Sequence, residues 1–488
     1  MYLQTSTNMQ KIRKMNYFIL GLLPAAFACQ SGVKDKEQGN NNETGDRPNV
    51  ILLLADDLGY GDLSCYGSQS IQTPHLDDLA KEGMKFTHFY AASAVCTPSR
   101  ASILTGKFPL RFDIRQHFTD STEHLPEGTP TLATMLAEAG YATAHIGKWH
   151  LGGLRPSDIR RRQAGEKALP GPLEHGFDHY LTSIEGAPIR PRLIRERQLY
   201  REGGHYMLRN DERAPDNDKH WTEIKINEAC RLLADWEDGN QPFFLNLWFD
   251  VPHTPYEPAP EPHLSKYKNL GVTGDQLYFR SMVSHLDAQI GRLIDTLKAR
   301  NLYQNSLIFF TSDNGPAYEG SPGPFKGGKT DLHEGGIRVP MFAIWKGHIP
   351  ENTQSFQTMH MVDLLPTIGE AANIKPEIDD LDGTSMLSHL RGGSRIERGV
   401  LLWQMDLYRH FQNQGPKPKP YATSVAMKGK WKLLADSLEP TELFNLRQDH
   451  RELYNQLGEH PEIKQELLEA LKKFHAAPRN RWPEIEYK

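Results

Sequence analysis

Residues 49–57 read Asn-Val-Ile-Leu-Leu-Leu-Ala-Asp-Asp, and this run decides the fold class of the chain. An unbroken apolar run of this length is typical of a strand that is buried on both faces of a parallel sheet. Two aspartates follow it directly, at the sheet edge where α/β proteins bind their ligands. The run therefore predicts a buried strand that carries two carboxylates to a functional site.

Further apolar runs repeat this pattern of a strand followed by polar residues. They occupy residues 141–146, 243–249 and 306–311, and are followed by Gly147-Lys-Trp-His150, Asp250-Val-Pro-His253 and Ser312-Asp-Asn-Gly315. A fifth apolar run, residues 339–345, is also expected to be a parallel strand, and helical patterns at 131–139, 221–236 and 278–299 lie between the runs. Alternation of strands and helices implies right-handed crossovers. We therefore expect an α/β domain with a mostly parallel central sheet and helices on both faces.

The C-terminal part has a different pattern. Short strand candidates at 399–403, 424–427, 430–434 and 441–445 are separated by turn residues, and residues 461–475 form an amphipathic helix pattern. We expect a catalytic domain over residues 48–395 and a smaller subdomain over residues 396–488, with a short antiparallel sheet and a closing helix.

The N-terminus has the pattern of an export signal. Lys11, Arg13 and Lys14 precede a short apolar stretch over residues 17–28, and Cys29 follows a small residue as in bacterial lipoproteins. We expect residues 1–28 to be the signal and residues 29–47 to be a flexible linker. The expected location is the periplasm, or the outer membrane of a Gram-negative bacterium through a lipid on Cys29; cleavage to an unanchored product is the alternative.

Composition excludes several classes of protein. The 488 residues carry a net charge of −5 and a mean hydropathy of −0.59. These values do not fit a polytopic membrane protein or a nucleic-acid binder, and no nucleic-acid partner is expected. Four cysteines in a chain of this length do not make a disulfide scaffold. Cys65 and Cys230 are expected either to pair or to stay free.

The most specific motif is residues 96–106, Cys-Thr-Pro-Ser-Arg-Ala-Ser-Ile-Leu-Thr-Gly. This segment resembles the signature of the formylglycine-dependent sulfatases, Cys-x-Pro-Ser-Arg followed by four residues and Thr-Gly. The family belongs to the alkaline phosphatase superfamily. The resemblance extends over roughly residues 48–475 and includes the strand-end motifs and Gly-Lys-x4-Glu-Gly-Gly at 328–336.

The resemblance implies that Cys96 is oxidised to formylglycine by a maturation enzyme. A hydrated aldehyde carries two hydroxyl groups on one carbon: one attacks sulfur, and loss of the proton from the other expels sulfate and restores the aldehyde. Residues 98–104 should be helical, which would place Cys96 at a helix N-terminus that favours an anionic group.

Two sets of polar residues are expected around Cys96. Asp56, Asp57, Asp313 and Asn314 offer only oxygen ligands, which suit a hard cation, and the resemblance implies one Ca²⁺. Asn314 is informative, because zinc phosphodiesterases of the superfamily typically carry His at this position. The second set consists of basic residues. The resemblance implies that Lys148 and Lys329 contact the sulfate group, and that Arg100 and His150 hold the formylglycine hydrate. His253 is the expected general acid. Lys329 is chosen over Lys326 because it lies five residues before Glu334, the spacing of the family, and Lys326 is a candidate for an additional sulfate or substrate contact.

The substrate is the least determined feature. Residues 155–209 hold 11 Lys or Arg against 7 Asp or Glu. This positive excess would attract a sulfated polysaccharide; the alternative is that the segment is an ordinary solvated loop with paired charges. Candidate sugar contacts in this segment are His175, His179, Glu185, His205 and Tyr206. We expect hydrolysis of a sulfate ester on a sugar of a glycosaminoglycan, mucin or algal polysaccharide. The alternatives are a phosphoester hydrolase of the same superfamily, or a non-catalytic glycan-binding lipoprotein if Cys96 is not converted.

Overall fold

The computed structural model describes residues 47–118, 122–183, 207–215, 218–237, 241–376, 378, 380–406 and 421–479. The chain divides into two compact units, residues 1–45 and 46–488, and every described residue belongs to the second. The predicted export signal, Cys29 and nearly all of the predicted linker therefore lie outside the described residues. Across the described ranges, no helix combines the length and apolar character that a bilayer span requires.

The centre of the fold is a block of four parallel strands. Strand β1 (Asn49–Ala55) lies between β9 (Ser306–Ser312) and β8 (Phe243–Trp248), and β4 (Ala142–Gly147) lies beyond β8. Leu52 of β1 is in register with Phe309 of β9 and Asn246 of β8. The predicted parallel core is confirmed, and its four strands end at the same edge.

The ten-stranded sheet continues on both sides of this block. On one side it adds β10 (Met341–Ile344), β2 (Met84–Phe86) and β11 (Thr353–Ser355), and on the other β5 (His179–Ser183), β6 (Met207–Arg209) and β7 (Glu212–Arg213). The prediction that residues 339–345 form a parallel strand is wrong, because β10 runs antiparallel to β9. Its connection from β9 makes no crossover: the chain loops at the strand ends and returns from the same edge.

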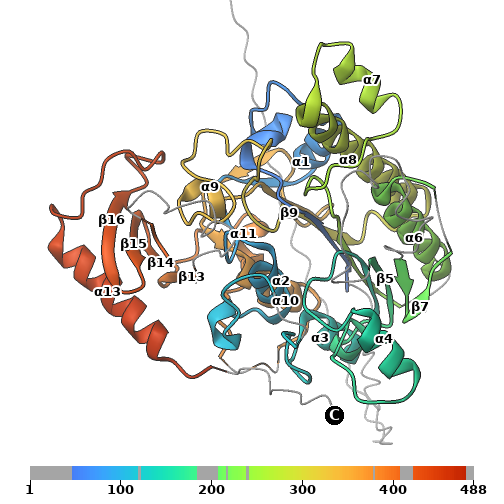
Figure 1. The fold of residues 1–488 in the computed structure, drawn as a ribbon, viewed down its shortest axis with the longest axis horizontal. Coiled ribbons are helices and arrows are strands. Elements are labelled where there is room, and N and C mark those ends of the chain that lie inside the picture. Colours follow the sequence, from blue (N-terminus) through green and yellow to red (C-terminus); the bar gives the residue numbers. More distant parts are fainter. Residues whose placement is uncertain are drawn as a thin grey trace, which may run out of the picture. The chain divides into compact units, whose positions relative to one another are not determined.

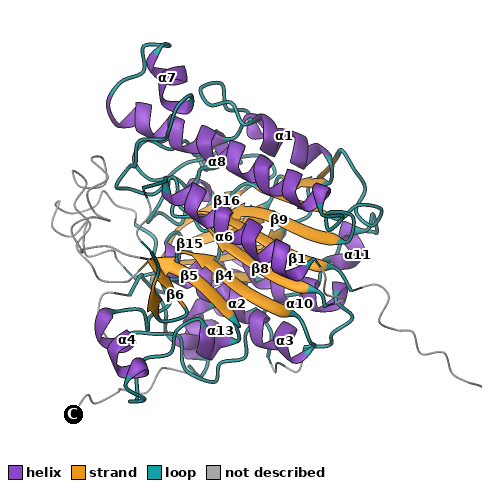
Figure 2. Cartoon of the chain, turned by 90° about the vertical axis from the view of Figure 1, so that its right-hand side faces the viewer, coloured by secondary structure: helices purple, strands orange, loops and turns teal. Residues whose placement is uncertain are grey.

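Helices cover both faces of the sheet (Figures 1 and 2). Alternate residues of β1 explain this layering, since Leu52 and Leu54 pack into one core while Ile51 and Leu53 pack into the other. The first core includes residues of α2 (Cys96–Thr105), α3 (Leu132–Glu138), α4 (Pro156–Gln163), α10 (Leu364–Ala371) and α11 (Leu387–Leu390). The second includes residues of α1 (Pro74–Lys81), α6 (Trp221–Trp236) and α8 (Gly274–Ala299), and α7 (His263–Lys268) contacts α8.

The C-terminal subdomain is an antiparallel sheet with one helix on it. The sheet runs in the order β13 (Leu401–Gln404), β14 (Ser424–Lys428), β15 (Trp431–Asp436) and β16 (Glu439–Asn445). Helix α13 (Pro461–Ala476) packs Leu467 and Leu471 on one face of this sheet. The other face shares a core with β3 (Phe89–Tyr90), which pairs with β12 (Met359–His360), and with the short helix α9 (Glu334–Ile337). The predicted sheet and closing helix are confirmed.

Candidate active site

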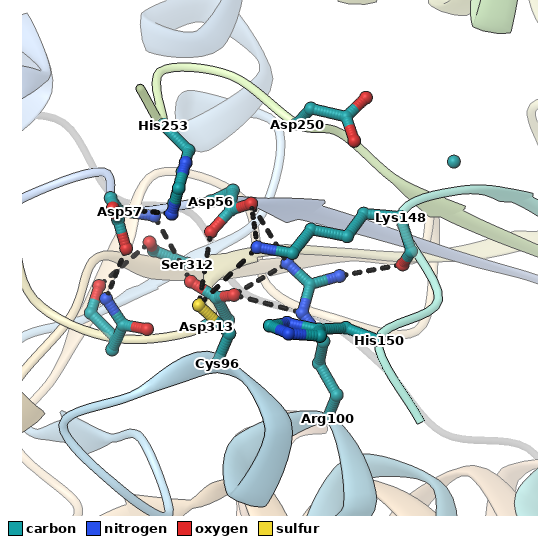
Figure 3. A network of polar contacts seen from close by, with 12 residues as sticks. Asp56, Asp57, Cys96, Arg100, Lys148, His150, Asp250, His253, Ser312 and Asp313 are labelled. Atoms are coloured by element: carbon teal, nitrogen blue, oxygen red, sulfur yellow. Dashed lines mark hydrogen bonds and ion pairs between the residues drawn. The ribbon is translucent and has the colours of Figure 1, made fainter. Parts of the chain in front are cut away.

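The four central strands bring the predicted site residues to one edge of the sheet. Asp56 and Asp57 follow β1, Lys148 and His150 follow β4, His253 follows β8, and Asp313 and Asn314 follow β9. Cys96 and Arg100 come from α2, and Lys329 comes from the loop before α9. Contacts among the strand-end residues and α2 form one polar network (Figure 3).

Cys96 is the first residue of α2 and faces two charged groups. Val95 before it is extended, so the helix begins at the cysteine. The Cys96 Sγ lies 3.6 Å from a carboxylate oxygen of Asp56 and 3.5 Å from the Lys148 Nζ. Burial raises the pKa of the Cys96 thiol to about 12, although Lys148 and Lys329 oppose the shift. An unmodified thiol at this position is therefore protonated at neutral pH and is a weak nucleophile.

The three aspartates differ in their electrostatic environments. Burial alone would raise the pKa of Asp56, but Lys148 and the other nearby cations hold it well below its ordinary value. Asp313 is affected by burial and by the charge of Asp56, which raise its pKa to about 6 although Arg100 opposes them. Asp57 adopts a left-handed backbone with φ of 64°, which for a non-glycine residue is uncommon outside turns and functional sites.

A group of side chains at this edge could hold a metal ion, and it includes two of the four expected oxygen ligands, Asp56 and Asp57. Ligand atoms of Asp56, Asp57, Cys96 and His253 lie within 4.8 Å of one another. The Asn314 Nδ2 donates to Asp57 at 2.8 Å, while its Oδ1 is buried and has no hydrogen-bond partner. A buried carbonyl oxygen of this kind is a natural ligand for Ca²⁺. Asp313 is the least available of the four expected ligands, because one of its oxygens accepts from Arg100 at 2.6 Å and the other from the Asp57 N–H at 3.2 Å.

Three cations neutralise the three carboxylates. The Lys148 Nζ lies 2.6 Å from Asp56, and the Lys329 Nζ lies 2.7 Å from Asp57. Burial would lower the pKa of both lysines, but their aspartate partners outweigh it and keep both ammonium groups charged. Arg100 is completely buried, with its guanidinium between Asp313 and the Lys148 carbonyl, which accepts at 2.8 Å. Fixed cations of this kind can stabilise an anionic ester and its transition state.

The alternative lysine, Lys326, occupies a different position. Its Nζ pairs with Glu442 of the C-terminal sheet at 3.1 Å. Of the two lysines, Lys329 is therefore the one in contact with Asp57.

The two histidines reach the site from different strand ends, His150 after β4 and His253 after β8 (Figure 3). His150 has a left-handed backbone with φ of 60°, and its buried Nδ1 has no hydrogen-bond partner. Burial, Lys148 and Arg100 lower the pKa of His150 well below its ordinary value, so its ring is neutral. The His253 Nε2 lies 3.6 Å from Asp57, and its side chain is 32% exposed, so it reaches the opening of the site. Burial and Lys329 lower the pKa of His253, against the opposing effect of Asp57.

Sequence reasoning missed one charged pair beside the site. Asp250 follows β8 and pairs with Lys225, which is buried on α6. The signal was present in the sequence, because Lys225 stands between Ile224 and Ile226 in a helix whose neighbouring positions face the core. A lysine within such an apolar run needs a buried partner.

The sugar-contact candidates from residues 155–209 have mixed outcomes. His175 is completely buried, with its ring 5.7 Å from that of Trp149, so it does not reach the surface. His179 pairs with Glu228 at 2.8 Å. Glu185, His205 and Tyr206 lie outside the described residues.

Cys65 and Cys230 are free rather than paired. The Cys230 Sγ contacts the Thr296 hydroxyl at 3.4 Å, and the Cys65 N–H donates to Asp77 at 2.9 Å. The Cys230 thiol thus has a local polar neighbour instead of Cys65.

The fold and site define a hydrolase of anionic esters: a nucleophile position at a helix N-terminus faces paired carboxylates and fixed cations at the ends of parallel strands. Residues 48–374 match the family described as Sulfatase, and residues 328–477 match N-sulphoglucosamine sulphohydrolase, C-terminal. The chain therefore belongs to the sulfatase family of the alkaline phosphatase superfamily, and it is a sulfuric ester hydrolase.

Relatives and solved structures agree with this assignment. The chain is 33% identical over 380 residues to the N-acetylgalactosamine-6-sulfatase of Canis lupus familiaris, covering 74% of this chain and 69% of the relative. It is 28% identical over 534 residues to the N-acetylgalactosamine-6-O-sulfatase of Bacteroides thetaiotaomicron, covering 93% and 98%. The crystal structure of Ps i-CgsB in complex with k-i-k-neocarrahexaose superposes with a TM-score of 0.77 at 27% identity, covering 90% of this chain and 96% of that one.

Proposed function

We propose that this protein hydrolyses a sulfate ester on a sugar, with a formylglycine made from Cys96 as the nucleophile and one Ca²⁺ in the site. The observation that carries the proposal is the position of Cys96, at the N-terminus of α2 and within 3.6 Å of both Asp56 and Lys148. A buried thiol whose pKa is about 12 has no evident catalytic use in that position. A hydrated aldehyde would supply a hydroxyl nucleophile and a second hydroxyl whose deprotonation releases sulfate.

The chain's own residues would then act as follows. Asp56, Asp57 and Asn314 hold the metal, with Asp313 as the fourth ligand. When bound, Ca²⁺ would supply positive charge to a sulfate oxygen and to the attacking hydroxyl. Lys148 and Lys329 bind the sulfate oxygens, and Arg100 and His150 orient the nucleophile. His253, on the open side of the site, donates a proton to the leaving alcohol.

A sulfated sugar is the substrate that the relatives favour. Two of the relatives described above are named for N-acetylgalactosamine 6-sulfate groups, and the structural neighbour was solved with k-i-k-neocarrahexaose. The candidate polymers are a glycosaminoglycan, a mucin and an algal polysaccharide. A panel of sulfated disaccharides that differ in sugar and sulfate position would assign the substrate, and sugar sulfatase activity is contradicted if none of them is turned over while nitrophenyl sulfate is.

The formylglycine proposal is tested by peptide mass spectrometry on protein matured in a competent host. The peptide that contains residue 96 should show the loss of mass expected when a thiol becomes an aldehyde. Cys96→Ala should fold with an unchanged melting temperature and lose activity. Full activity in a preparation whose residue 96 is entirely unmodified thiol would overturn the mechanism.

Export and a lipid anchor at Cys29 remain proposals that rest on the sequence of residues 1–29. Metabolic labelling with a fatty acid should mark the intact protein in its native host and should not mark Cys29→Ala. An unlabelled protein that has been cleaved after Ala28 would favour an exported, unanchored product.

A further inference from the structure

Residues 326–336, which comprise the loop that carries Lys329 and the start of α9, contact the C-terminal subdomain on their outer side. The hydroxyl of Tyr421, which lies just before β14, donates to the Thr330 carbonyl at 3.3 Å. The Lys432 Nζ of β15 donates to Glu334 at 2.9 Å. A third contact joins a ring nitrogen of His333 to Glu442 of β16 at 2.8 Å. Several side chains of one subdomain thus contact one short segment of the catalytic domain.

The same loop is joined on its inner side to the residues around Cys96 and the metal ligands. The N–H of Lys329 donates to the Pro316 carbonyl at 2.8 Å. The N–H of Gly315, next to Asn314, donates to the Gly336 carbonyl at 2.8 Å. The loop therefore carries both the ammonium group that contacts Asp57 and a support for the turn that ends β9.

Thr330, directly after Lys329, has an unfavourable backbone conformation that contacts with neighbouring residues maintain. Its φ is +69°, in the left-handed region that β-branched residues avoid. Its N–H donates to the Ala94 carbonyl at 2.8 Å, and its own carbonyl accepts from Tyr421. Such strain persists where neighbouring groups over-determine the conformation, and it is concentrated at functional sites.

The charges at the other end of the loop are buried and balanced. Glu334 is completely buried and accepts from Lys432 and from Arg338, the latter at 3.1 Å. Its N–H donates to Glu452 at 2.7 Å, and Lys432 also lies 2.8 Å from Glu452. Two carboxylates and two cations therefore share this position. Removing one cation would leave a buried charge uncompensated, whereas removing one cation together with one carboxylate would not.

We propose that the C-terminal sheet sets the position of Lys329 for sulfate binding, with Tyr421 and Lys432 as positioning residues. The inference rests on the proposed role of Lys329 as a sulfate contact. Neither residue touches the Lys329 side chain in the contacts described; they act through Thr330 and Glu334. Displacement of a binding group by about 1 Å can cost about 100-fold in rate, so residues that hold Lys329 in place from a distance should have a measurable effect on sulfate binding.

The first test is a double-mutant cycle between Tyr421→Phe and Lys329→Ala, with nitrophenyl sulfate as the substrate and inorganic sulfate as a competitive inhibitor. Tyr421→Phe removes one hydroxyl and should leave the melting temperature nearly unchanged. It should raise the inhibition constant for sulfate about 3- to 10-fold, the range expected for one hydrogen bond. In the Lys329→Ala background it should add nothing further, because the group that it positions is gone.

The second test separates position from charge with Lys432→Met and Lys432→Met/Glu452→Gln. The double variant keeps the buried cluster electrically balanced and should fold, yet it still lacks the contact to Glu334. Its inhibition constant for sulfate should therefore stay raised although its melting temperature recovers. Lys428→Met is the matched control, since Lys428 is a half-exposed lysine of the neighbouring strand that pairs with Glu466, and it should behave as wild type.

The outcomes distinguish this inference from the proposed function. If Lys329→Ala itself leaves the inhibition constant for sulfate unchanged, Lys329 does not bind sulfate. The proposed function of Lys329 is then wrong, and the proposal that Tyr421 and Lys432 position it for sulfate fails with it. Two other outcomes would overturn only the positioning role of Tyr421, provided that Lys329→Ala weakens sulfate binding. In one, Tyr421→Phe has no effect on sulfate inhibition; in the other, it has the same effect in wild type and in the Lys329→Ala variant. A double variant at residues 432 and 452 with normal sulfate inhibition would overturn the role of Lys432 as well.

Discussion

At the scale of single residues, the site is a balance of buried charge. Arg100, Lys148 and Lys329 face Asp56, Asp57 and Asp313. Arg100 and the three aspartates are buried and the two lysine side chains are only 16% exposed, an arrangement that is tolerable only because each charge has a partner. Removal of one member leaves an opposite charge uncompensated. A neutral residue of the site can therefore be replaced without disturbing this balance.

Asn314 is the neutral residue that tests the metal. Its Oδ1 is buried without a hydrogen-bond partner, so Asn314→Ala removes a proposed oxygen ligand without removing a charge. We expect calcium affinity to fall about 10- to 100-fold, by analogy with the loss of a supporting group at other metal sites. Ca²⁺ at 100 times its dissociation constant stabilises a protein by about 2.7 kcal/mol, so the thermal shift on adding Ca²⁺ should be large in wild type and smaller in the variant.

Asn305 supplies the control for this measurement. It is exposed and lies just before the opposite end of β9, so Asn305→Ala should keep the full calcium-induced shift. Metal analysis of wild type should find about one hard divalent ion per chain and little zinc. Two tightly bound zinc ions would instead support the phosphodiesterase alternative.

His253 is tested through its dependence on the leaving group. A sugar alkoxide needs a proton as the S–O bond breaks, whereas nitrophenolate needs little help, so His253→Ala should lose about 10²- to 10⁴-fold on a sulfated sugar and far less on nitrophenyl sulfate. Burial and Lys329 lower the pKa of His253, so its protonated fraction falls as pH rises, beginning below the ordinary value of about 6.5. Sugar sulfate hydrolysis by wild type should fall over the same range.

Lys329→Ala is the comparison for His253, because a sulfate contact serves both substrates equally. Equal losses on both substrates in His253→Ala would assign this histidine to sulfate binding. Lys329 would then be the first candidate for the proton donor.

Single residues also show how far sequence reasoning reached. The ten candidate residues could be named because each belongs to a motif or to a strand end. The contacts among these residues could not be predicted. No feature of the neighbouring sequence indicates that Arg100 donates a hydrogen bond to Asp313, which leaves that aspartate less available to a metal. Lys432 was also missed, although it stands between Trp431 and Leu433 in a strand whose four middle residues are all buried, which is the same signal as at Lys225.

At the scale of elements, the ends of neighbouring strands are packed so closely that side chains are excluded. Gly147 ends β4 with φ of +109°, and a Cβ there would lie 1.6 Å from the Trp248 carbonyl oxygen of β8. The next residue, Lys148, donates its N–H to that same oxygen at 3.0 Å. The position of the Lys148 ammonium group therefore depends on glycine at the preceding position.

Gly147→Ala should accordingly impair both stability and catalysis. A left-handed residue other than glycine costs about 1–2 kcal/mol, and the clash with backbone adds to this, so we expect a loss of about 3 kcal/mol or more in urea unfolding. Gly140 is the matched control, since its φ is +86° and a Cβ there would meet nothing within 4 Å. Gly140→Ala should lose only the stability that the left-handed backbone conformation costs, and it should keep its activity. Equal losses in the two variants would show that close strand packing is not the cause.

The elements that sequence patterns predicted best are those with long, strongly apolar cores. The parallel strands and the helices over 221–236 and 461–475 appear close to their expected bounds. The direction of β10 could not be predicted, because an apolar strand pattern is the same in either direction and only the connecting loop decides. Strands β5, β6 and β7 were missed because they are short and lie in a segment dominated by charged residues, glycine and proline.

At the scale of the whole molecule, His333 is an ion-pair link between the catalytic domain and the C-terminal sheet. One ring nitrogen contacts Asp331 at 2.6 Å, and the other contacts Glu442 of β16 at 2.8 Å. Burial would lower the pKa of His333, but the two carboxylates outweigh it and raise the pKa to about 9. The histidine therefore carries its charge in the folded protein at neutral pH.

This link makes the stability of the molecule depend on pH in a defined direction. Because the folded pKa of His333 exceeds the unfolded value of about 6.5, its contribution is complete below about pH 6.5 and is lost as pH rises through about 9. The difference between the two values corresponds to about 3 kcal/mol at most. His333→Gln should therefore be clearly less stable than wild type in urea at pH 6, and the gap should narrow by pH 9.5. His460, which is partly exposed and lies 3.7 Å from the exposed Glu462, provides the control: His460→Gln should show a small gap at both pH values. A gap for His333→Gln that stays constant or widens toward pH 9.5 would show that the residue packs at the junction without its charge joining the two parts.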